Sequence, residues 1–251
     1  MTRRGLAIAV LLGALSGAPA FAEGPLSMTA LTSAANEDGG TTYSLSLQIL
    51  ALMTALTVLP SIVLGMTSFT RVIIVLSILR QALGTQQTPP NQILIAIALF
   101  LSFSIMTPTL SKINDSALSP YMAEQISADE AIRRSSDTIK GFMLLNTRSD
   151  ALLMFSDMAG ETAYEGRADV PFSVVLPAFI TSELKTAFQI GFLIFLPFLV
   201  IDMVIASILM SLGMMMLSPM LISLPFKLLL FVLVDGWAMT MGSLASTFVS
   251  Q

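Results

Sequence analysis

Long apolar segments alternate with short polar ones along most of this chain, and the pattern predicts an all-α membrane protein. Apolar residues dominate positions 45–66, 93–111, 186–212 and 220–245. Even the shortest of these segments, with 19 residues, is long enough as a helix to approach the thickness of a bilayer's hydrocarbon core. We therefore expect four hydrophobic helices arranged as two hairpins.

Each pair of apolar segments is joined by a turn whose residues disfavour helix. Residues 84–91 are polar and contain two consecutive prolines, and Gly213, Ser218 and Pro219 mark the second turn. Glycine and proline both interrupt helices. The predicted hydrophobic hairpins cover residues 45–111 and 170–251.

Charged residues predict which side of the membrane each connection faces. Arg71 and Arg80 precede the first turn in a stretch without acidic residues, and positive charge favours the cytoplasmic side. Residues 112–169 hold six basic and ten acidic residues, a balance that fits a periplasmic region. We expect two or three surface helices there, with an N-cap at Ser119 and a capping box at residues 147–150. Both mature termini are then periplasmic and both hairpin turns cytoplasmic.

The first residues have the pattern of a secretory signal peptide. Two arginines are followed by an apolar run and then by small residues that suit cleavage. The apolar run is short against the ~20 residues of a membrane span, so an uncleaved membrane helix is the less favoured alternative. We expect a cleavable peptide at residues 1–22 and a flexible polar lead at 23–44. The predicted cleavage site consists of Ala20, Ala22 and Glu23.

Composition agrees with a membrane protein and limits the available chemistry. Hydrophobic residues make up 55% of the 251 residues and charged residues only 11%, against roughly 25% charged in soluble domains. The sequence has no cysteine and no histidine, which excludes disulfides, thiol nucleophiles, Ser-His-Asp triads and the usual zinc and haem ligands. It also lacks a phosphate-binding glycine loop and a basic nucleic-acid patch. We expect a protein that is not an enzyme, binds no metal and needs no cofactor.

Seven charged residues lie within or directly against the apolar segments. A charge that faces lipid at mid-depth costs at least ~2.5 kcal/mol on insertion scales. These side chains must therefore face protein or water, either buried in the chain or between subunits. They are Arg71, Arg80, Glu183, Lys185, Asp202, Lys227 and Asp235.

Helix geometry allows one pairing among these charges. Counted from the middle of the second turn, Asp202 lies 14 residues before it and Lys227 lies 11 after it, an axial offset of ~4.5 Å. A salt bridge can form within the hairpin or between subunits, and such pairs can fix the register of an assembly. For Arg71, Glu183 and Lys185, positions at interfacial helix ends are an equal alternative.

A function of a different class, proton-coupled transport of a small solute, would use the acidic residues. Glu183, Asp202 and Asp235 could relay protons if one water-filled path connected them, but their spacing does not show such a path. Transporters of this kind often contain inverted repeats, and no internal repeat relates the two halves of this sequence. Transport of a small solute is therefore the runner-up.

Methionine is concentrated at the second turn. Five of the 17 methionines lie between Met210 and Met220, and Met214, Met215 and Met216 are consecutive. The flexible thioether side chain repacks around changing partners, so a ring of such turns could close a pore and still yield to a passing polypeptide. The alternative is ordinary core packing, but three consecutive side chains at a bend cannot all enter one helix interface.

Two blocks of sequence carry a family resemblance. The first consists of MTSFTRVIIVLS at residues 66–77 and RQALGTQQTPPNQ at 80–92, and the second begins with FITSELKTAFQIGF at 179–192. The second block continues through MMMLSP, LPFK and VDGW, which end at residue 237. Together they resemble the FliP family of flagellar type III export gate proteins very closely.

The resemblance implies a function that the residue pattern alone does not give. Members of this family form an oligomeric, helically arranged gate with FliQ-like and FliR-like subunits and an FlhB-like subunit in the bacterial inner membrane, at the flagellar basal body. Unfolded flagellar proteins pass through it. The methionine turn is expected to act as a gasket around the channel, and Glu183 and Lys227 to hold neighbouring subunits together. Injectisome relatives share the fold, but the signal peptide and the acidic region are more similar to the flagellar branch.

Overall fold

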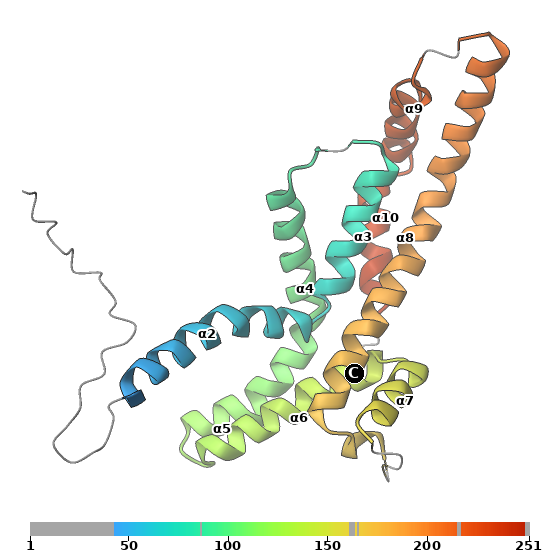
Figure 1. Ribbon diagram of the computed structural model, residues 1–251. Coiled ribbons are helices and arrows are strands. Elements are labelled where there is room, and N and C mark those ends of the chain that lie inside the picture. Colours follow the sequence, from blue (N-terminus) through green and yellow to red (C-terminus); the bar gives the residue numbers. More distant parts are fainter. Residues whose placement is uncertain (1–42, 86, 161–163, 165, 215–216, 249–251) are drawn as a thin grey trace, which may run out of the picture. The chain divides into compact units, whose positions relative to one another are not determined.

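The computed structural model describes residues 43–248 apart from 86, 161–163, 165 and 215–216, and all regular elements in that part of the chain are helical (Figure 1). This confirms the predicted all-α fold. The signal peptide, its cleavage site at Ala20, Ala22 and Glu23, and the polar lead up to residue 42 lie outside the described residues, as do Met215 and Met216.

The helices follow one another with short connections. A π-helical turn, Asn114–Leu118, links α4 to α5, and a 3-10 turn, Arg167–Asp169, precedes α8. The α-helices are α2 (Tyr43–Gly65), α3 (Phe69–Ala82), α4 (Asn91–Ile113), α5 (Ser119–Met122), α6 (Ala128–Asn146), α7 (Ser149–Met158), α8 (Phe172–Ser211), α9 (Pro219–Leu233) and α10 (Gly236–Ser246).

The chain divides into two compact units between Thr57 and Val58, a boundary that falls within α2. The described part of the first unit is the N-terminal portion of α2, whose apolar side chains are exposed from Ile49 onwards. All other helices belong to the second unit. The second unit therefore contains every structural feature discussed below.

Two described helices are long and apolar enough to cross a membrane, Asn91–Met122 and Phe172–Ser211. Two bent pairs of helices would each meet the same criterion if counted as one span, which raises the number to as many as four. The four predicted hydrophobic segments are compatible with this result.

The helix α3 was not among the four predicted hydrophobic helices; it lies between the predicted segments 45–66 and 93–111 and forms part of the core. Val72, Val75 and Leu76 are completely buried, and Leu79 nearly so. These residues recur at the spacing of one helix face, and the most extensive contact that α3 makes with another described helix is with α8 (Figure 1).

The second hairpin also differs from the prediction. Its first arm, α8, is a 40-residue helix that begins after Pro171 and includes Pro177 and Pro197, so residues 186–212 are only its C-terminal part. Its second arm is not the single helix expected at 220–245. It breaks into α9 and α10, whose axes differ by 64°.

The break between α9 and α10 has a local cause. Asp235 adopts a left-handed conformation with φ of 51°, and Gly236 follows it at the start of α10. The ring of Phe231 lies where a side chain at residue 236 would be, within 2.2 Å of an ideal Cβ position. Phe231 also meets Trp237 edge-on, with ring centroids 5.4 Å apart. A continuous helix would disrupt this aromatic packing.

The acidic region contains the expected surface helices, but the predicted caps were wrong. Ser119 lies inside a helical run that continues from α4 through the π-helical turn. No capping box forms at residues 147–150, since Thr147 donates its hydroxyl hydrogen bond back to Met143 O at 2.6 Å. Ser127 instead caps α6 by accepting a hydrogen bond from Glu130 N at 3.3 Å.

Glycine permits the close approach of α3 and α8. A Cβ atom at Gly191 would lie 2.4 Å from Ile78 Cδ1 and 3.2 Å from Ile78 Cβ; Gly191 is buried and Ile78 is half-buried. At Gly242, by contrast, an added Cβ would meet nothing within 4 Å. The two glycines therefore form a matched pair for testing whether α3 and α8 pack as described.

We expect Gly191→Ala to lower the thermal stability of the detergent-solubilised protein, by an amount in the ~1–3 kcal/mol range of overpacked cores. Gly242→Ala should leave stability unchanged or raise it slightly, because alanine favours helix over glycine by ~1 kcal/mol. Thermal unfolding followed by circular dichroism measures both. Equal effects of the two substitutions would contradict the packing of α3 on α8.

Candidate functional site

A buried ion pair joins α3 to α8. Arg71 Nε donates to Glu183 Oε2 at 2.9 Å, and Arg71 Nη2 donates to Glu183 Oε1, so the guanidinium holds both carboxylate oxygens. Glu183 is fully buried and Arg71 is 3% exposed. Such a two-bond arrangement combines charge attraction with a fixed orientation.

The same guanidinium also binds the C-terminal end of α10. Arg71 Nη1 donates to Thr247 O at 3.1 Å and to Thr247 Oγ1 at 2.9 Å. The guanidinium carbon lies 3.8 Å from the centre of the Phe248 ring, which places the cation over the aromatic face. Arg71 therefore connects three helices that are far apart in sequence.

A second ion pair joins α8 to α9. Lys227 Nζ lies 2.6 Å from Asp202 Oδ2, and Ser223 donates a hydrogen bond of 2.6 Å to Asp202 Oδ1. Lys227 also donates to Ala82 O, at the C-terminal end of α3, at 3.1 Å. Its positive charge thus meets both a carboxylate and the negative end of a helix dipole. The salt bridge that spacing allowed within the hairpin is present in the chain.

The remaining predicted charges are more exposed. Lys185 pairs with Asp150 of α7 at 2.8 Å, and the hydrogen bond from this lysine lowers the pKa of the Asp150 carboxyl. Arg80 donates to Pro89 O at 3.1 Å and to Asn91 Oδ1 at 2.6 Å, which holds the loop between α3 and α4. Asp235 is exposed at the break between α9 and α10.

The methionine turn is defined at both ends by backbone signals. Gly213 has φ of 72° and donates to Met210 O, and Met214 N donates to Leu209 O at 3.0 Å. These two bonds form the glycine-ended C-cap typical of helices. Ser218 then precedes α9 in an extended conformation, and Pro219 is its first residue. The Met214 side chain is 44% exposed.

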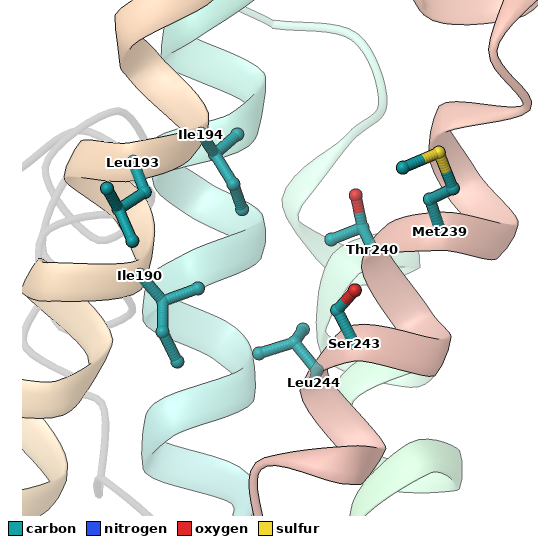
Figure 2. Close-up of a pocket in the computed structure, with 7 residues that line it drawn as sticks. All are labelled: Ile190, Leu193, Ile194, Met239, Thr240, Ser243 and Leu244. Atoms are coloured by element: carbon teal, nitrogen blue, oxygen red, sulfur yellow. The ribbon is translucent and has the colours of Figure 1, made fainter.

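A groove of about 330 Å³ separates part of α8 from α10 (Figure 2). Figure 2 shows side chains of α8 facing those of α10 across it, with the Thr240 and Ser243 hydroxyls on the α10 side. Thr240 already donates its hydrogen bond to Gly236 O at 2.7 Å. The lining residues are Ile190, Leu193, Ile194, Met239, Thr240, Ser243 and Leu244.

Comparison with known proteins decides the family. The pattern described as the FliP family matches residues 52–244, which is most of the chain. The chain belongs to the FliP family.

Individual relatives agree. "Flagellar biosynthetic protein FliP" of Cereibacter sphaeroides is 71% identical over 213 residues, covering 85% of this chain and 71% of the relative. The protein of the same name from Pectobacterium carotovorum subsp. carotovorum is 55% identical over 213 residues, with 85% and 83% covered. That of Bacillus subtilis (strain 168) is 54% identical over 205 residues, with 82% and 93% covered.

The structure of this FliP-family chain gives partners to two charges that were expected to join neighbouring subunits. Glu183 is bonded to Arg71, and Lys227 to Asp202, both within one chain. Sequence reasoning missed the first pair because its members are 112 residues apart and meet only when α3 packs on α8. Thr247 and Phe248, which complete the Arg71 cluster, were also missed, and nothing in their sequence context distinguishes them.

Glu183 and Asp202 of this FliP-family chain do not form a contiguous relay. Glu183 and Asp202 both lie on α8, 19 residues apart, which corresponds to about 28 Å along the helix. Each is bonded to its own basic residue. The structure thus brings these charges together as two separate interhelical clusters.

We expect Glu183→Gln to destabilise the protein by about 3–5 kcal/mol, because the substitution leaves the buried Arg71 without a counter-charge. Replacing Arg71 and Glu183 together by methionine should be less harmful than Glu183→Gln alone, because both desolvated charges are then removed. Thermal unfolding of the purified protein measures each variant.

The matched control is Lys185→Met, which breaks an exposed pair on the same helix. Exposed ion pairs contribute little to stability, so its unfolding temperature should stay near that of the wild type. A Glu183→Gln protein as stable as the Lys185→Met protein would show that the buried pair does not join α3 to α8.

Proposed function

We propose that this flagellar biosynthetic protein is a pore-forming subunit of the flagellar type III export gate, through which unfolded flagellar proteins cross the inner membrane. The FliP-family protein is a component of the flagellar export apparatus, and its long apolar helices give it a membrane-associated location. Family membership alone does not establish that the chain forms a pore, so this part of the function is our proposal.

The observation that carries the proposal is the contrast between the inside and the outside of the second unit. Its ion pairs are satisfied internally, whereas large apolar side chains cover the outer faces of α8 and α9. Phe192 is 62% exposed, Leu229 66% and Val232 75%. Apolar surface on this scale marks contact with other proteins or with lipid. A subunit that packs side by side with others around a channel would cover it.

The proposed partners follow from the family. We infer a homo-oligomer that is completed by FliQ-like and FliR-like subunits, with an FlhB-like subunit associated, and surrounded by membrane lipid. The proposed site is the inner membrane at the flagellar basal body. The acidic region at residues 112–169, which contains α5 to α7, and both termini would face the periplasm, because acidic connections are tolerated on the translocated side whereas basic ones are retained in the cytoplasm.

Within this assembly, the methionine turn would serve as the channel gasket. Met214 is exposed at the turn, which is consistent with side chains that project from the hairpin. Copies of the turn arranged around an axis would place flexible thioether groups in the passage. Such groups exclude ions when packed together and still move aside for a polypeptide.

The proposed role is not enzymatic. The energy for export would come from an ATPase and the proton-motive force, which act elsewhere in the machine. The relatives described above are named for flagellar biosynthesis, which favours the flagellar gate over an injectisome gate.

We expect replacement of Met214, Met215 and Met216 by alanine to leave the complex assembled but to make its closed state conduct ions, because alanine cannot fill the passage. Planar-bilayer conductance of the purified complex measures the leak. Size-exclusion chromatography of the same sample establishes that assembly is intact.

The control is a second triple alanine variant at exposed methionines outside the turn, Met122, Met154 and Met158. This protein should remain as impermeable as the wild type. An assembled turn variant with wild-type conductance would remove the gasket assignment and leave the export-gate role to be judged separately.

The oligomeric pore is tested by the mass of the complex. We expect the chain, co-expressed with its gate partners and extracted in detergent, to elute as a complex that contains several copies of itself. Light scattering with correction for bound detergent gives the protein mass. A chain that stays monomeric in the presence of those partners would contradict a pore built from several copies.

A further inference from the structure

Asp235 differs from the other charges of the apolar segments because its carboxylate has no partner. Its side chain makes no hydrogen bond or ion pair with any residue that the structure describes, and it does not cap α10. Its backbone, by contrast, is fully used, since Asp235 N donates to Val232 O and Met239 N donates to Asp235 O, both at 3.1 Å. The backbone is thus held in place while the carboxylate is left free.

The backbone at residue 235 has a positive φ angle, and aspartate is not the residue that adopts this conformation most readily. A φ of 51° is adopted most readily by glycine and is also accessible to asparagine. The break itself is required by the packing of Phe231 against Gly236, so residue 235 cannot return to a helical conformation without disturbing that contact. Glycine or asparagine would therefore fit the bend at least as well as aspartate, and the bend alone does not explain the negative charge.

The surroundings of Asp235 make a free carboxylate costly. From residue 228 to the end of the sequence it is the only charged residue. Leu233 and Val234 before it and Trp237 and Met239 after it are exposed apolar side chains. In a lipid environment a free carboxylate at such a position is unfavourable, and ionisable residues in these segments normally have a functional partner.

No basic residue that the structure describes is free to pair with Asp235 within this chain. Arg71 and Lys227 are buried and already bonded to carboxylates, and Lys185 pairs with Asp150. Arg80 donates to two oxygens of its own loop. The other described basic residues also interact within the chain; they are Lys112, Arg133, Arg134, Lys140, Arg148 and Arg167. A second copy of the chain could therefore offer one of these cations only by breaking an existing interaction. Charge complementarity therefore favours a chain of different sequence.

We propose that Asp235 is a docking point for a lysine or arginine side chain of a different protein subunit, which reaches the break between α9 and α10 within the membrane. Asp235 is exposed at this bend, and the exposed apolar side chains around it would exclude water from the pair once the partner is bound. This inference rests on the proposed function, since it requires a gate built from more than one kind of chain.

The test separates charge from backbone conformation. Asp235→Asn and Asp235→Gly both suit the αL conformation and both remove the charge. We expect each variant to fold with the wild-type unfolding temperature but to retain at least about tenfold less of its partner subunits after affinity purification in detergent, since truncating a buried charge pair typically costs 2–5 kcal/mol, and 1.4 kcal/mol is tenfold. Wild-type partner retention by either variant would overturn the proposal.

The identity of the partner is tested by photo-crosslinking. A benzophenone amino acid in place of Val234, next to the carboxylate, should form a crosslink to a chain of different sequence, at a position beside a lysine or arginine. Crosslinks only to another copy of this chain, or to no protein, would overturn the proposal. If the wild-type chain recovers no partner subunit at all, the proposed gate function itself fails, which is a different result from a partner complex insensitive to residue 235.

Discussion

The bond between Arg71 and Glu183 is the constraint on which the rest of the second unit depends. Both groups are removed from water, so the pair persists only if α3 and α8 keep one register and one separation. The close approach at Gly191 supplies that separation, and the buried face of α3 supplies the register. Because Arg71 also holds Thr247, the C-terminal end of α10 is positioned by the same interaction.

The two ion-pair clusters fix two different parts of α8. The Arg71 cluster holds the part of the helix nearest its beginning, and the Asp202 cluster holds the arm that leads to the methionine turn. Lys227 ties this second cluster to the end of α3 through Ala82 O. The helix α3 is therefore bonded at both ends, and the surface between the clusters needs only apolar contacts. This arrangement explains how a chain with so few charges can place several of them in its interior.

How much of this could be read from the sequence depended on the distance between interacting residues. Asp202 and Lys227 flank a turn marked by glycine and proline, so counting along two helices was enough to pair them. Arg71 and Glu183 could not be paired in this way, because the packing of α3 on α8 decides their contact. The helix α3 was not predicted as a separate element, although Val72, Val75 and Leu76 follow a helical spacing. The break at Asp235 had a signal that went unused, an Asp-Gly pair inside an apolar run. The groove of α8 and α10 had none.

The helix caps on either side of the methionine turn affect how the sequence of this turn can evolve. The bonds that end α8 join backbone atoms of Leu209, Met210, Gly213 and Met214, and α9 starts at a proline. None of these interactions uses a thioether. If the turn lines a channel as proposed, substitution there can change the width and hydrophobicity of that channel while the hairpin geometry is kept. Residues at this turn could therefore change to suit exported polypeptides of a different diameter without a loss of folding stability.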